Sequence, residues 1–132
     1  MTTNRNNNPE ASIIHKCREV IKLLNVYLNH FPRHEKYGLC QQMRNTAYEI
    51  YALIVECQKR YHKKTSMSLL DIRHEQLRMF VHLAFELGYL RFKDGRTDER
   101  NPDKLEQKRL KAISVPVNEL GAMIGGWMRS SQ

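Results

Sequence analysis

The sequence predicts an all-α protein, an antiparallel up-down-up-down four-helix bundle. Four long segments carry apolar residues at spacings of three or four, which places those residues along one side of a helix. No run alternates strictly enough between apolar and polar residues to compete as a strand. Polar connections separate the segments, as expected for helices that reverse direction. One such core accounts for the 132 residues, so a second domain is not expected.

The first helix is expected over about residues 9–29. Asn8 is a candidate N-cap, Pro9 suits the first helical position, and Glu10 suits the positive end of the helix. Residues 1–8 are polar and are expected to form a disordered tail. The apolar stripe consists of Ile13, Cys17, Val20, Ile21, Leu24, Tyr27 and Leu28.

The second helix is expected over about residues 35–62. Pro32 lacks an amide donor and biases Phe31 towards an extended backbone, so residues 30–34 are expected to form a short connection. The next helix therefore runs antiparallel to the first. Its apolar stripe consists of Cys40, Met43, Ala47, Ile50, Ile54, Cys57 and Tyr61.

The third helix is expected over about residues 66–91, after a polar break at 62–66. Ser66 or Ser68 is the candidate N-cap. The expected core stripe, interrupted by Gln76, consists of Leu69, Ile72, Phe80, Leu83, Leu87 and Leu90.

The fourth helix is expected over about residues 102–129. Residues 93–103 before it are too polar to bury and contain glycine and proline, which predicts a mobile loop. Asn101, Pro102 and Asp103 form a second sequence of N-cap, proline and acid. Pro116 is expected to kink or interrupt this helix.

Cysteine and histidine give no sign of catalysis or metal binding. Cys17, Cys40 and Cys57 fall on helical apolar spacings and are interpreted as reduced core residues. His30 and His34 are four apart, but Pro32 between them prevents one continuous helical face. Nucleotide-binding, hydrolase and zinc-protease motifs do not occur in the sequence. We therefore expect no catalytic residue, no metal and no cofactor.

One set of polar residues follows a single stripe of the third helix. It consists of Asp71, Glu75, Arg78 and His82. Their spacing favours a solvated face with Glu–Arg support, and a surface that meets a partner is the alternative. Catalysis is disfavoured, because nothing raises a carboxylate pKa on an open helix.

The net charge of +8 favours a polyanion or a strongly acidic partner. The chain has no apolar run long enough for a membrane span and no signal-peptide core, so a cytoplasmic protein is expected.

Three glycines interrupt the pattern of the last helix, at Gly121, Gly125 and Gly126, next to Trp127. Each costs about 1 kcal/mol relative to alanine inside a helix. One interpretation is a frayed helix end at Gly125 and Gly126. The other is close approach of a backbone from this or another subunit to the face shared by Gly121 and Gly125, with Trp127 in an adjacent apolar pocket.

This segment, together with Phe31-Pro32 and Tyr37-Gly38-Leu39, resembles the accessory variability determinant family of diversity-generating retroelements. The resemblance extends over roughly residues 10–130, and the Gly-x-x-x-Gly-Gly-Trp ending is its most specific part. It implies a four-helix bundle that assembles into a basic, ring-like or barrel-like homopentamer. It also implies binding to the element's reverse transcriptase and a need for the protein when template RNA is copied into mutated cDNA. The family protein is an accessory and not the polymerase.

Two features depart from the family pattern. The residue after the first glycine is usually basic in the family but is Ala122 here, so a contact at that position is not carried over. The 93–103 loop is also longer than the pattern calls for. A more distant resemblance links the chain to the four-helix protein encoded in intervening sequences of ribosomal RNA genes, which shares the Phe-Pro connection.

Basic residues cluster outside the apolar stripes, at the end of the second helix and in the first turns of the fourth, where Lys104, Lys108, Arg109 and Lys111 lie. The first cluster either stabilises the negative end of a helix or contacts phosphates. The candidate contacts to nucleic acid or reverse transcriptase are Arg33, Lys36, Arg44, Lys59, Arg60, Lys63, Lys64, Arg73, Arg78 and Arg129.

The bundle topology brings the 59–64 cluster, Arg73 and Arg129 to one end, where they are expected to form a basic rim that an oligomer multiplies into a ring. Most aromatic residues fall on core spacing, which argues against base stacking and favours backbone contacts with little sequence preference. The alternative function is a protein-interaction scaffold, or a ribosomal-RNA-associated protein, without a reverse-transcriptase partner.

Overall fold

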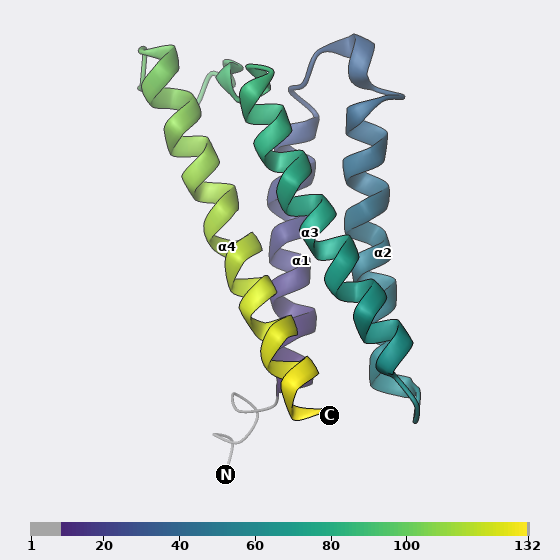
Figure 1. Ribbon diagram of the computed structural model, residues 1–132. Helices are drawn as coiled ribbons and strands as arrows, with labels where there is room; N and C mark the ends of the chain where they lie inside the picture. The colour runs from purple at the N-terminus through teal and green to yellow at the C-terminus, as the bar shows by residue number, and fades with distance from the viewer. Residues whose placement is uncertain (1–8, 132) are drawn as a thin grey trace.

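A computed structural model describes residues 9–131, which form four α-helices and two short 3-10 turns (Figure 1). The elements are α1 (Pro9–Leu28), η2 (Arg33–Glu35), α2 (Leu39–Lys59), α3 (Lys64–Glu86), η3 (Tyr89–Arg91) and α4 (Pro102–Ser130). No strand occurs within this range, which confirms the all-α prediction. The expected tail at 1–8 and its Asn8 cap lie outside the described residues.

The four helices pack side by side in the order of the chain, and α4 closes the bundle against α1. Successive helices point in opposite directions (Figure 1). The helix order and direction fit an up-down-up-down bundle. The end of α2, the start of α3 and the end of α4 therefore lie together, at the lower end in Figure 1.

One core lies between the helices and includes the three cysteines as buried free thiols, as predicted. Burial raises the pKa of Cys17 to about 12. None of the described helices is both long and apolar enough to cross a bilayer.

The second helix is shorter than expected, at both ends. Residues 33–35 form η2 after Pro32, and α2 starts only at Leu39. The amide of Leu39 donates to Glu35 Oε1 at 3.0 Å, so Glu35 satisfies an amide of the first turn from outside the helix. At the other end Arg60 has an extended backbone (φ −80°, ψ 140°), which ends α2 at Lys59.

The third helix starts without a side-chain cap, so the prediction of Ser66 or Ser68 as N-cap is wrong. α3 begins at Lys64, and Ser66 is buried inside it, where its hydroxyl donates to Glu56 Oε2. The helix ends at Glu86 because Gly88 takes a left-handed conformation (φ 79°). η3 then covers the upper end of the core with Leu90.

The expected core stripe of this helix is wrong at four of its six positions, whereas Leu90 is buried and Phe80 packs partly buried against the core. The buried residues of α3 are Ser66, Met67, Leu70, His74, Leu77, Val81 and Ala84. Most of the expected stripe instead faces solvent: Leu69 is 37% exposed, Ile72 50%, Leu83 44% and Leu87 48%. Apolar residues thus occupy two opposite sides of α3, and both sides satisfy the helical spacing.

The start of the fourth helix is as predicted. The Asn101 side chain accepts hydrogen bonds from the amides of Asp103 and Lys104, and Pro102 occupies the first turn. α4 runs unbroken through Pro116 to Ser130, so an interruption at Pro116 and a helix stop at Gly125 and Gly126 are both wrong. A kink at Pro116 stays a prediction.

Arg109, expected on the surface of α4, is buried instead. Its guanidinium donates to the carbonyls of Leu90 and Phe92, lies 3.4 Å from Asp94 Oδ2, and stacks 3.6 Å from the centre of the Phe92 ring. It therefore ties η3 and the following loop to α4. Mobility of residues 93–103 stays a prediction.

Candidate nucleic-acid interface

The candidate interface lies where α2 passes into α3 beside the end of α4. We call this surface the basic end and define it by Lys59, Arg60, Lys63, Lys64 and Arg129. Residues 60–63 connect the two helices, and none of them is buried in the core. Four of these side chains are exposed, and Lys63 is half-buried.

A small polar network holds this connection in place. The Glu56 carboxylate accepts a hydrogen bond from the Ser66 hydroxyl. Arg60 Nη1 lies 3.4 Å from Glu56 Oε2 and 3.3 Å from Ser66 Oγ. The hydrogen bond from Ser66, followed by Arg60, lowers the pKa of the Glu56 carboxyl. Arg60 is thus engaged in joining α2 to α3.

The other cations of the basic end have no carboxylate partner within residues 9–131. Lys63 Nζ lies 5.6 Å from the centre of the Trp127 ring, over the end of α4. Lys59, Lys64 and Arg129 are open to solvent. Their positive charge is therefore available to an anionic partner.

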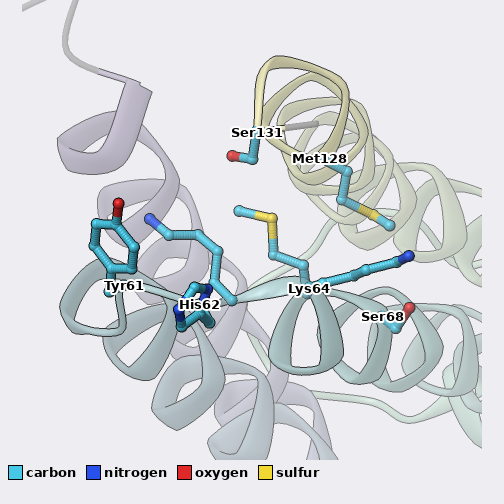
Figure 2. Close-up of a pocket in the computed structure, with 8 residues that line it drawn as sticks. Tyr61, His62, Lys64, Ser68, Met128 and Ser131 are labelled. Atoms are coloured by element: carbon cyan, nitrogen blue, oxygen red, sulfur yellow. The ribbon is translucent and has the colours of Figure 1, made fainter.

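An open hollow of about 670 Å³ lies at this end, and Figure 2 shows residues that line it. Tyr61 and His62 stand on one side of it and Lys64 and Ser68 on the other. Met128 and Ser131 of the α4 end face them across the opening. The lining residues are Tyr61, His62, Lys63, Lys64, Met67, Ser68, Met128 and Ser131.

Two of the predicted contacts lie away from the basic end, in the middle of α3. Arg73 Nε lies 2.6 Å from Glu49 Oε2 and so links α3 to α2, outside the basic rim expected for it. Arg78 forms two hydrogen bonds to Glu75, at 2.8 and 2.7 Å. The Glu–Arg support expected for that stripe is therefore present, and contact of the stripe with a partner stays a prediction.

Three more predicted contacts lie at the opposite end of the bundle. Arg33 and Lys36 are exposed on and after η2. Arg44 is half-buried and donates to Asn25 Oδ1 at 3.0 Å and Asn29 Oδ1 at 2.8 Å, so it joins α2 to α1. This end carries a separate positive surface.

The glycine segment packs inside the chain. Gly121 faces the His74 imidazole, whose Nε2 lies 2.8 Å from the carbonyl oxygen of Val117. Trp127 is 7% exposed and belongs to the core. Gly125 and Gly126 are half-buried, and the neighbouring side chain at both is Arg129 of their own helix. The close neighbour of Gly121 is therefore a side chain of α3 in the same subunit, and not the backbone that was expected there.

Two features escaped the sequence reasoning. Tyr61, expected in the core, is 91% exposed because α2 ends two residues before it. The outer face of α3 forms an exposed apolar stripe, which we define as Leu69, Ile72, Met79, Leu83 and Leu87. The signal for the second feature was present, because α3 has more apolar residues than one face needs.

Within the described residues, no group of three or more His, Cys, Asp or Glu could hold a metal ion.

The comparison with protein families agrees with the resemblance noted from the sequence. No curated protein matches the chain at a significant level. The model of the bAvd-like family matches residues 12–131, which includes all of α2, α3 and α4 and most of α1. The chain therefore belongs to the bAvd-like family, the family of accessory variability determinants.

Proposed function

We propose that this chain is a non-enzymatic accessory protein of a diversity-generating retroelement. In this role it binds template RNA or cDNA and the element's reverse transcriptase, in the cytoplasm, and supports mutagenic cDNA synthesis. Membership of an accessory-protein family supports the role. The observation that carries nucleic-acid binding is the set of cations at the basic end that have no carboxylate partner among residues 9–131.

The chemistry of that end suits phosphate. Lys63 lies in the connection between α2 and α3, Lys59 and Lys64 flank it, and Arg129 lies near the end of α4. Lysine and arginine side chains contact phosphate oxygens without reading bases, and each contact releases counterions from the nucleic acid. Binding should therefore be strongly dependent on salt.

A salt titration tests this proposal. The logarithm of RNA affinity should fall linearly with the logarithm of salt concentration, by about 0.7–0.9 per phosphate contacted. The double variant Lys63→Gln/Lys64→Gln should bind more weakly and with a smaller slope. Lys104→Gln/Lys111→Gln, at the opposite end, is the matched control. Affinity that is indifferent to salt, or equal losses in both variants, would contradict a phosphate site at the basic end.

The apolar outer face of α3 supports a second proposal, that copies of the chain assemble with one another. Five large apolar side chains exposed along one helix face are typical of a protein interface. In a cyclic ring, this face of one copy would meet a different face of the next. The resemblance implies five copies, and a ring would gather their basic ends.

The same apolar face favours one alternative, a scaffold that binds only protein. An electrophoretic competition between RNA and the reverse transcriptase separates the two functions. An accessory protein of the proposed kind should bind both, whereas a scaffold should bind no nucleic acid by itself.

A further inference from the structure

Tyr61 lies beside the basic end, in the connection between α2 and α3. It is 91% exposed, although tyrosine usually buries much of its ring. The chain leaves α2 at Lys59 and turns at Arg60, so Tyr61 projects from the connection and not into the core. In this position the Tyr61 ring forgoes the stabilisation that burial in the core would give, and its surface is open to a binding partner.

The surroundings of Tyr61 combine a ring and positive charge. Its ring meets the His62 ring edge to face, with centroids 4.8 Å apart and an angle of 89° between the planes. Lys63 and Lys64 follow directly in the chain, and all four residues line the hollow. In Figure 2 Tyr61 and Lys64 stand on opposite sides of this opening.

An aromatic ring next to lysines that have no carboxylate partner among the described residues suits the bases and the phosphates of a single nucleic-acid strand. The bases of a single strand present free π-faces that stack on aromatic side chains, while the phosphates pair with cations along the same groove. In a duplex the base faces are already stacked on one another. A hollow of about 670 Å³ is within the range of roughly 300–1,000 Å³ that holds small ligands, and so can admit one nucleotide.

We propose that Tyr61 stacks on a base of single-stranded nucleic acid whose flanking phosphates contact Lys63 and Lys64. This inference rests on the proposed nucleic-acid binding and assigns to it a strand form and a stacking residue. It replaces the expectation of phosphate contacts alone, which assumed that Tyr61 lies in the core.

The test compares single-stranded and double-stranded probes on the full chain by fluorescence anisotropy. The probes are an oligoadenylate, which forms no base pairs with itself at neutral pH, the same strand with abasic sites, and a duplex of equal length. Tyr61→Ala should lower affinity for oligoadenylate roughly 5- to 150-fold, the range for loss of one stacked base. Tyr61→Phe should bind like wild type. Because no phosphate contact is lost, the salt slope should stay the same in both variants.

The matched control is Tyr37→Ala. Tyr37 is 80% exposed at the opposite end of the bundle, and Lys36 Nζ lies 5.4 Å from its ring centre. This variant removes an exposed tyrosine beside a lysine without touching the hollow, so its affinity should equal that of wild type. Tyr61 contacts little in the subunit, and circular dichroism should show unchanged helicity in all three variants.

The outcomes separate the inference from the function on which it rests. Wild type should prefer oligoadenylate to the abasic strand and the duplex, and Tyr61→Ala should remove that preference. The stacking site is overturned if Tyr61→Ala binds oligoadenylate as tightly as wild type does, or if wild type binds the duplex as tightly as oligoadenylate. In either case salt-dependent binding would still support the phosphate site. Failure of wild type to bind any of the three probes overturns both.

Discussion

Gly121 of α4 lies directly against the His74 imidazole of α3. A Cβ atom added to Gly121 would be 2.9 Å from His74 Nε2 and closer still to Cε1. His74 is 7% exposed and is fixed by its hydrogen bond to the Val117 carbonyl, so it has little freedom to move. The glycine thus allows two helices to meet at a buried histidine.

Gly121→Ala should therefore destabilise the fold. Overpacking costs about 1–3 kcal/mol and the helical preference of alanine returns about 1 kcal/mol, so a net loss of up to about 2 kcal/mol is expected in chemical denaturation. Gly125→Ala is the control. The nearest atom to its added Cβ is the mobile end of Arg129, at 3.4 Å, so this variant should gain up to about 1 kcal/mol. Equal effects of the two variants would refute the role assigned to Gly121.

Charge on the outer face of α3 should disrupt assembly. Ile72 and Leu83 are 50% and 44% exposed, and the double variant Ile72→Glu/Leu83→Glu places two acids on that face. Light scattering should show a multiple of 15.7 kDa for wild type and a single chain for the variant. Val26→Glu on α1, where Val26 is 53% exposed, should keep the mass of wild type. An unchanged mass in the double variant would exclude this face as the contact between copies and leave the reverse transcriptase as its partner to test.

Loss of Arg109 should loosen the upper end of the bundle. Arg109→Met removes the charged donor from the Leu90 and Phe92 carbonyls, and hydrogen bonds to charged groups contribute about 1.5–3 kcal/mol each. We expect a loss of at least about 2 kcal/mol and faster hydrogen exchange at residues 89–101. Lys108→Met changes the neighbouring exposed cation, which pairs only at the surface with Glu99, and should cost less than about 1 kcal/mol. If exchange stays slow at 89–101 in Arg109→Met, the arginine does not hold this segment.

Acid should weaken the junction at Glu35. The amide of Leu39, then the Tyr89 hydroxyl, donate to this carboxylate and lower its pKa below the ordinary value of 4.5. The unfolded chain therefore takes up the proton first, and the stabilisation is present above pH 4.5 and is lost as pH falls through the lower folded-state pKa. In urea titrations across this range Glu35→Gln should show a flatter dependence on pH than wild type. Tyr89→Phe, which removes one donor, should fall between them, and parallel curves for all three would contradict the assignment.

Helical spacing alone was enough to predict four helices and their order. The cap of α4 was predicted to the residue, because Asn101, Pro102 and Asp103 act within one turn and need no distant partner. The ends of α2 were not predicted correctly. Glu35 caps this helix from outside, and the extended backbone of Arg60 ends it earlier than expected.

The candidate site was predicted in part. The cluster at Lys59–Lys64 does lie at one end of the bundle beside Arg129, as antiparallel helices require. Arg73 and Arg109 were expected at the surface because of their charge. Each pairs with a carboxylate from another part of the chain, Glu49 and Asp94 respectively, and local sequence patterns do not predict such pairs.

By itself the sequence determined the helical class, the antiparallel order and the family, because spacing, caps and the glycine-tryptophan ending are properties of short segments. Only the tertiary structure decided which side of α3 is buried. Both sides carry apolar residues at helical spacing, and the choice depends on which one fits α2 and α4, with His74 placed against Gly121. The tertiary structure also turned Tyr61 outward, because the point at which a helix ends is set by contacts between helices as well as by its own residues.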